Sequence, residues 1–217
     1  MDPIERARLR IAEVIAGSSV PEDPRHSSNT VEWLLRLAPD ADAALQLAAL
    51  GHDIDRAVSA RKVRRADFDD YDEFKAAHAR NGAEILGEIL WDCGVREEPL
   101  TREVQRLVCR HEVGGDARAD LLVDADSISY FDVNLPLYHA RNSRMESLRR
   151  CLWGYERLSP RARSIVAQLR QPNDELEALM AEVISRSAPS SGHPQRQVPA
   201  IERLALEGSA PHRTPRT

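Results

Sequence analysis

The sequence has few cysteines and no long apolar run, and both absences restrict the kind of protein it can encode. Its three cysteines, Cys93, Cys109 and Cys151, lie far apart and form no C-x-x-C pair. This spacing argues against a disulfide framework and a thiolate zinc site, and it favours a reducing compartment. No window approaches the ~20 apolar residues of a membrane span, and the first 17 residues lack the apolar core of a secretory signal. We therefore expect a cytoplasmic protein that does not enter a membrane.

The charge is also not strongly of one sign. The formal net charge is -5, and acidic and basic residues are interspersed instead of being collected into a basic arm. Nothing in this pattern indicates a nucleic-acid partner. Hydrophobic residues make up 42% of the 217-residue chain, which is enough for one domain with appendages.

Strand-like alternation of polar and apolar residues is missing, whereas apolar residues recur at intervals of three and four. This periodicity predicts an all-α fold. The predicted helices cover residues 3–17, 27–38, 40–58, 70–94, 100–112 and 119–131, with two or three more between 137 and 187. The predicted organisation is an N-terminal helix (1–19), a main domain (20–160), C-terminal helices (161–187) and a tail (188–217). The tail is rich in Pro, Ser and Arg, and we expect it to be disordered.

Histidines and aspartates are distributed over the predicted helices in a pattern that suggests a shared site. The candidate residues are His26, His52, Asp53, His78, His111 and Asp126. Neutral imidazoles and carboxylates are good ligands for divalent transition metals, and a helical bundle gathers such groups from facing helices. A single histidine on an apolar helix is more often a hydrogen-bonded core residue. The complete series favours ligation.

The order of this series resembles the H…HD…H…H…D signature of the HD-domain superfamily of metal-dependent phosphohydrolases, over roughly residues 20 to 135. The segment "AALGHDID" is similar to the family's "LLHDIG", "HARNGAEIL" to its "H-x-x-x-G-A" and "LVDADSI" to its "ADxL". The resemblance implies a helical bundle in which His26, His52, Asp53 and Asp126 hold a metal. With His78 and His111 also present, it implies a dinuclear site bridged by Asp53, and a mononuclear site is the alternative. The alignment favours Asp126 over Asp124 as the ligand.

The implied cofactor is one or two divalent transition-metal ions. The sequence does not distinguish Fe, Mn, Zn, Co and Ni, and Mg is also open. Such an ion lowers the pKa of a bound water and polarises a phosphoryl oxygen. The resemblance therefore predicts hydrolysis of a phosphomonoester or phosphodiester bond in a small, anionic, nucleotide-like substrate.

Asp55 and Arg56, which follow the pair His52–Asp53, are candidate catalytic residues. On a continuous helix Arg56 shares a face with His52 and Asp53, and its guanidinium matches the geometry of a phosphate. HD-GYP phosphodiesterases have a lysine there, in "HDIGK". The alternative for Arg56 is a surface ion pair. Asp55 is a candidate general acid or base, an orienting acceptor for a ligand histidine, or a solvated carboxylate.

A basic connection follows, with Arg61, Lys62, Arg64 and Arg65 as candidate substrate-binding residues beside Arg56. A solvated loop is the alternative. We also expect residues 137–158, with arginines at 141, 144 and 149, to close the core and line the pocket mouth. His139, His193 and His212 fall outside the metal pattern.

Two other functional classes share the metal-ligand pattern. Some proteins with these ligands are diiron oxygenases, but those commonly have a lysine where this chain has Gly115. An inactive sensor or interaction module usually lacks ligands, and none is missing here. Apolar faces on the C-terminal helices leave a homodimer open.

Overall fold

The computed structural model describes residues 1–187, and the regular structure in this range is entirely helical. The predicted all-α class is confirmed. Residues Met1–Ser187 form one compact unit, and the predicted boundaries at residues 20 and 160 fall inside it. The predicted tail, residues 188–217, lies outside the described residues. None of the described helices has the length and hydrophobicity needed to cross a membrane.

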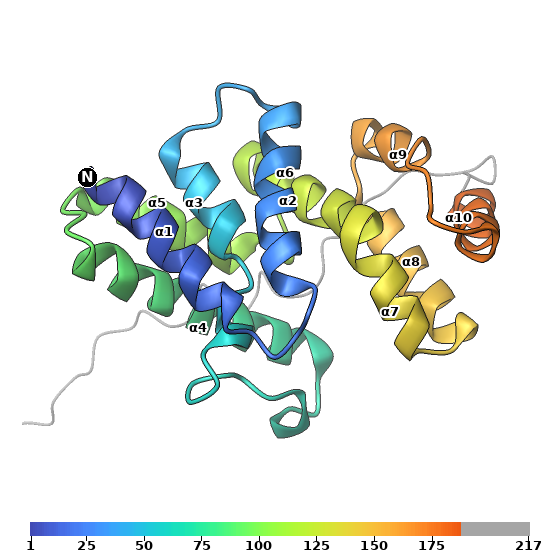
Figure 1. Ribbon diagram of the computed structural model, residues 1–217, viewed down its shortest axis with the longest axis horizontal. Coiled ribbons are helices and arrows are strands. Elements are labelled where there is room, and N and C mark those ends of the chain that lie inside the picture. The colour runs from blue at the N-terminus through green and yellow to red at the C-terminus, as the bar shows by residue number, and fades with distance from the viewer. Residues whose placement is uncertain (188–217) are drawn as a thin grey trace, which may run out of the picture. The chain divides into compact units, whose positions relative to one another are not determined.

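The first two thirds of the unit consist of helices that pack against one another around a shared apolar centre (Figure 1). The α-helices are α1 (Pro3–Ala16), α2 (Asp23–Leu37), α3 (Ala43–Gly51), α4 (Tyr71–Asp92), α5 (Glu98–Arg110) and α6 (Ala117–Ser129). Short 3-10 helices, η1 (Ile54–Ala57) and η2 (Arg65–Asp67), lie between α3 and α4. Helix α2 packs along α6, α4 packs along α5, and α3 contacts both α2 and α5. These contacts bring helices from distant parts of the sequence together.

Fully buried aliphatic side chains from every one of these α-helices form the core. They include Ile11, Leu34, Leu47, Leu86, Leu107, Leu122 and Ile128, each less than 2% exposed. Burial of such a side chain contributes about 1.5–3 kcal/mol relative to leaving it exposed. The small residues Ala48 and Ala49 let α3 approach its neighbours closely. The apolar packing therefore fixes where the polar residues at the helix ends meet.

Two of the boundaries predicted for the first six helices differ from the observed ones by one turn or more. Helix α2 begins at Asp23, about one turn before the predicted start after His26. Residues 23–26 lie outside the predicted helix, yet Pro24 lies in the first turn of α2, where its missing N–H costs no hydrogen bond. Helix α3 ends at Gly51 instead of continuing to residue 58, and Asp53 adopts φ -102° and ψ 14° before η1 begins. Arg56 is thus not on a continuous helix with His52.

The remaining helices form the C-terminal part of the unit. They are a π-helical turn (Tyr130–Asn134), α7 (Leu135–Arg141), α8 (Arg144–Arg157), α9 (Pro160–Val166) and α10 (Asp174–Ser187). Helix α8 packs against α6 and α10, and α9 packs against α6. Because α6 contacts both parts of the unit, α8 lies close enough to contribute side chains to the cavity described below.

Candidate metal centre

The six predicted ligands come together at the ends and inner faces of five helices. One group of three consists of His26 from α2, His52 at the end of α3 and Asp126 from α6. The two histidine Nε2 atoms are 3.2 Å apart. Oδ1 of Asp126 lies 3.2 Å from Nε2 of His26 and 3.5 Å from Nε2 of His52. Three potential ligand atoms therefore face one small space.

A second group consists of Asp53, His78 from α4 and His111 at the end of α5. Nε2 of His78 is 3.0 Å from Oδ1 of Asp53. The other oxygen of Asp53, Oδ2, faces the first group, 3.4 Å from Nε2 of His52 and 3.8 Å from Nε2 of His26. Each carboxylate oxygen of Asp53 is thus directed at a different group, which is the arrangement expected of a bridging ligand.

The opposite ring nitrogen of each histidine is held by the protein. Nδ1 of His52 lies 2.9 Å from the Ala49 carbonyl, and Nδ1 of His111 lies 2.7 Å from the Val108 carbonyl. Because a carbonyl only accepts, each Nδ1 must donate, which leaves the Nε2 lone pair of a neutral ring pointing inward. Nδ1 of His78 bonds the Asp55 carboxylate at 2.8 Å, and Nδ1 of His26 bonds the Ser129 hydroxyl at 2.9 Å.

The electrostatics of the cluster favour a cation. Burial opposes ionisation of Asp53 and Asp126, but neighbouring basic groups hold the pKa of both carboxyls well below the ordinary value. Burial also opposes charge on His52 and His78, yet the adjacent carboxylates raise the pKa of His52 and bring that of His78 to about 9. The ionised, buried carboxylates of Asp53 and Asp126 are therefore stabilised by positive charge nearby, from protonated groups or from a bound cation. Four imidazole nitrogens and two carboxylates are a donor set that fits divalent transition-metal ions.

Asp55 lies behind His78 and not between the two groups. Its side chain is 1% exposed, and its Oδ2 accepts from the His78 ring. Its Oδ1 accepts from the backbone N–H of Val63 at 3.3 Å and from the side-chain amide of Asn81. Asp55 thus fixes the ring orientation of His78, as carboxylates behind metal-ligating histidines do.

Arg56 reaches the cluster from η1. Its Nη1 is 2.7 Å from Oδ2 of Asp53 and 3.5 Å from Oδ1 of the buried Asp23. Its side chain remains 34% exposed. Arg56 therefore combines a contact with the predicted bridging carboxylate with access to anything that enters the site.

Two adjoining cavities lead to the cluster. The smaller, about 30 Å³, is bounded by four of the predicted ligands and by Glu112, Tyr130, Asn134 and Arg157. The larger, about 230 Å³, is bounded by Lys62, Lys75, the rings of Tyr71, Phe74 and Trp153, and His78. Arg56, Glu112 and Arg150 line both cavities. The two spaces thus share a wall, with the metal ligands at one end and aromatic rings at the other.

The predicted basic connection contributes only in part to these walls. Arg56 and Lys62 line the larger cavity. Arg61 instead pairs with Glu84 and Glu88 on the outer face of α4, at 3.6 and 2.5 Å. Arg64 and Arg65 are exposed and do not line either cavity.

Basic residues that the sequence analysis did not single out surround the ring of Trp153. Lys75, Arg150 and Arg157 each place a cationic group 4.2 to 4.5 Å from its centroid. Glu112 pairs with Lys75 at 2.9 Å and with Arg157 at 3.5 Å. Glu112 directly follows a predicted ligand, and positions 150, 153 and 157 share a helix face. These two signals could have identified the group.

The arginines expected at the pocket mouth lie elsewhere. Arg141 pairs with Glu22, Arg144 with Glu182, and Arg149 with Glu146 one turn earlier on α8. Their acidic partners explain the difference, because each of these arginines has a carboxylate within reach outside the two cavities.

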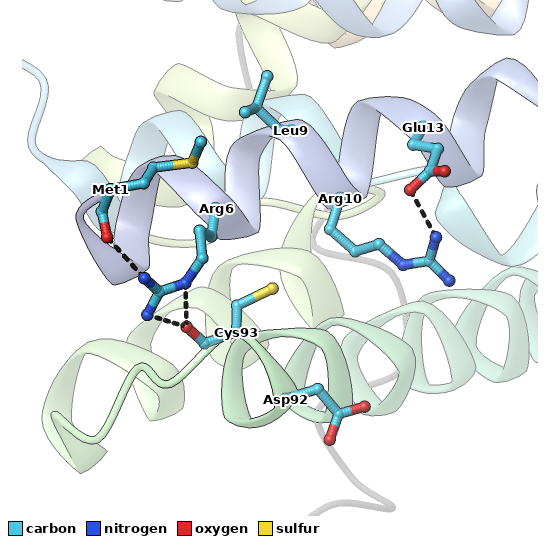
Figure 2. A pocket seen from close by; sticks show the side chains of 7 residues that line it. All are labelled: Met1, Arg6, Leu9, Arg10, Glu13, Asp92 and Cys93. Carbon is cyan, nitrogen blue, oxygen red and sulfur yellow. Dashed lines mark hydrogen bonds and ion pairs between the residues drawn. The ribbon is translucent and has the colours of Figure 1, made fainter.

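A separate groove of about 540 Å³ lies between α1 and the C-terminal end of α4 (Figure 2). Three of its charged side chains are already engaged, because Arg6 donates to the carbonyls of Met1 and Cys93, and Arg10 pairs with Glu13 at 2.6 Å. The groove shares no lining residue with the metal-ligand cluster. It offers no comparable set of ligands.

Comparison with known families places the chain in one of them. A family described as "Domain of unknown function (DUF4202)" matches residues 7–180, and the chain belongs to this family. The matched region includes all six clustered histidines and aspartates. No curated protein and no solved structure shows a significant match to the chain.

Proposed function

We propose that the protein is a metal-dependent phosphohydrolase that acts on a phosphomonoester or phosphodiester bond of a small, anionic, nucleotide-like substrate. The observation that carries the proposal is the convergence of four histidine Nε2 atoms and two carboxylates, with the Nδ1 of every histidine held by a hydrogen bond. A bound divalent ion would lower the pKa of a water and polarise a phosphoryl oxygen. The chain order of the ligands resembles that of the HD-domain superfamily, which supports the same chemistry.

Two ions are the form of the site that the geometry favours. The six ligands divide into two groups of three, and the oxygens of Asp53 are directed one to each group. In this arrangement His26, His52 and Asp126 would hold one ion, and His78 and His111 would hold the other. Asp53 would complete both sets of ligands.

The chain's own cations suit an anionic substrate. Arg56 lines both cavities and can donate to a phosphoryl oxygen while its Nη1 remains on Asp53. The larger cavity of about 230 Å³ lies just below the ~300–1,000 Å³ of typical ligand pockets, so it fits a small molecule. Its aromatic rings offer a flat apolar surface to the rest of that molecule.

Metal content tests the proposal first. Protein purified without chelators should contain near two transition-metal ions per chain by elemental analysis, and His78→Ala should lower this number to near one. His139→Ala is the matched control, because His139 bonds Ser147 and Glu175 away from the cluster. Near one ion in both the wild type and His78→Ala would indicate a mononuclear site. Absence of bound metal after incubation with Mn, Fe, Zn, Co or Ni would refute the proposal.

Activity is tested on a panel of nucleotides, phosphomonoesters and phosphodiesters. Asp53→Ala should abolish both metal retention and hydrolysis, and Arg56→Ala should mainly raise KM. Oxygen consumption is measured in the same preparations, because a diiron oxygenase would consume oxygen and leave phosphoesters intact. Metal retention with neither activity would support the sensor or interaction alternative.

A further inference from the structure

Arg150 is a cation whose position the proposed catalytic chemistry does not explain. It lies on α8, is half-buried, and lines both the small cavity at the metal ligands and the larger aromatic cavity. No carboxylate of the described part of the chain forms an ion pair with it. Its neighbours are instead two aromatic rings, Tyr130 with the centroid 4.6 Å from the guanidinium carbon and Trp153 at 4.5 Å.

These rings hold the guanidinium without using its hydrogen-bond donors. A guanidinium that lies over a ring face interacts with the π electrons of the ring. Its N–H groups therefore remain available as hydrogen-bond donors to a ligand. Arg150 therefore presents a rigid, half-desolvated set of donors where the two cavities meet. The contrast with Arg157 on the same face is informative, because Arg157 already pairs with Glu112 and donates to the His111 carbonyl.

A second polar group in the small cavity also lacks a partner. Asn134 is 8% exposed, and its Oδ1 has no hydrogen-bond partner among the described residues. A buried amide oxygen left unpaired costs free energy, and such groups are usually paired with a ligand or water. Asn134 lines the same cavity as Arg150 and four of the predicted metal ligands. The smaller cavity therefore offers unpaired polar groups that a polar ligand could pair with.

We propose that Arg150 is a substrate-binding residue that receives a phosphoryl group at the junction of the two cavities. This inference rests on the proposed function and adds to it the residue that recognises the phosphate. A planar fork of donors matches phosphoryl oxygens, and the unpaired charge complements an anion. Arg56, which is distant from Arg150 in the sequence, also lines both cavities and would bind the same phosphoryl group.

The test is the binding of inorganic phosphate to the full chain, measured by titration calorimetry at constant ionic strength, with and without bound metal. Arg150→Gln should weaken phosphate binding about 10-fold or more. Arg149→Gln is the matched control, because Arg149 is the adjacent residue on α8, has a side chain 69% exposed and pairs with Glu146. The control should bind phosphate as the wild type does.

A third variant, Arg150→Lys, distinguishes the contribution of the guanidinium donors from that of the positive charge. Arg150→Lys keeps the charge and should weaken phosphate binding less than Arg150→Gln but more than Arg149→Gln. Metal content and Tm, measured on the same preparations, should be equal in all three variants. Equal phosphate affinity in Arg150→Gln, Arg150→Lys and Arg149→Gln would overturn the assignment.

The outcomes distinguish this inference from the proposed function. If the protein hydrolyses no phosphoester but phosphate binding still depends on Arg150, the binding assignment holds and the hydrolase proposal fails. If hydrolysis occurs while phosphate binding is unaffected in Arg150→Gln, the hydrolase proposal holds and the role of Arg150 is wrong.

Discussion

Replacing Asp55 with asparagine should weaken metal binding at one of the two proposed sites and leave the other unchanged. The Asp55 carboxylate is buried behind His78 and holds the ring through a 2.8 Å bond to Nδ1. The amide introduced by this substitution would retain one acceptor for the bond, but it would lose the charge and place an N–H₂ group against the donors of Val63 and Asn81. The His78 ring would be held less firmly, and its Nε2 would be a weaker ligand.

The magnitude follows from what such supporting carboxylates contribute elsewhere. Their loss typically lowers metal affinity 10- to 100-fold, which corresponds to about 1.4–2.7 kcal/mol. The effect should be confined to the ion held by His78 and His111. The nearest support for the other group comes from Ala49 and Ser129, which Asp55→Asn does not touch.

Competition with a chelator of known affinity measures this difference. Asp55→Asn should release one ion at a chelator concentration 10 to 100 times lower than the wild type does, and the second ion at an unchanged concentration. Asp67→Asn makes the same chemical change at an exposed position in η2 and should behave as the wild type. Equal weakening of both ions, or of neither, would refute the positioning role of Asp55.

Two further predictions concern packing and charge. Gly51→Ala would place a Cβ 2.5 Å from Cδ2 of the buried Leu86 and should lower the free energy of unfolding by about 1–3 kcal/mol. Gly82→Ala, where the nearest atom would be 3.5 Å away, should instead raise it by about 0.5–1 kcal/mol. Urea unfolding measures both, and equal effects would contradict the packing argument. Arg118 donates to both oxygens of Asp42 and lowers the pKa of that carboxyl. A lowered folded-state pKa contributes stability above about pH 4, and this contribution is lost as the pH falls through the folded-state value. Arg118→Ala should therefore cost under about 1 kcal/mol at pH 7, because the pair is exposed, and less at pH 3. A cost that stayed constant between the two pH values would indicate lost packing instead.

The fold class and the set of clustered residues were accessible from the sequence because each depends on a repeating or ordered pattern. Apolar residues at helical spacing predicted the all-α class, which is confirmed. The series from His26 to Asp126 was predicted to share one site, and the structure brings all six side chains into two adjoining groups. Whether these groups hold metal remains a prediction.

What the sequence could not provide was the backbone path between the patterns. Gly51 is a possible helix end in the Ala-rich segment after residue 40, but the helical spacing of apolar residues continues to residue 58, so the change from α3 to η1 at Gly51 was not predicted. Asp55 bonds Nδ1 of His78, and the orientation of a ligand histidine was one of the alternatives that the sequence left open for it. The sequence spacing places Arg150 and Arg157 on one face of α8, but it does not show that α8 packs against α6, which is distant in sequence.

The same helices supply the residues of the candidate metal centre and of the apolar core, but the two sets of residues are different. Ligands come from α2 to α6, so the centre exists only when these helices are packed together. Bringing buried carboxylates and imidazoles together costs free energy unless a cation balances them. The helices are nevertheless held by aliphatic contacts such as those of Leu34, Leu47 and Leu86, which involve none of the ligands. A variant that loses a ligand therefore retains the contacts that define the fold, and its loss of metal can be attributed to the ligand itself.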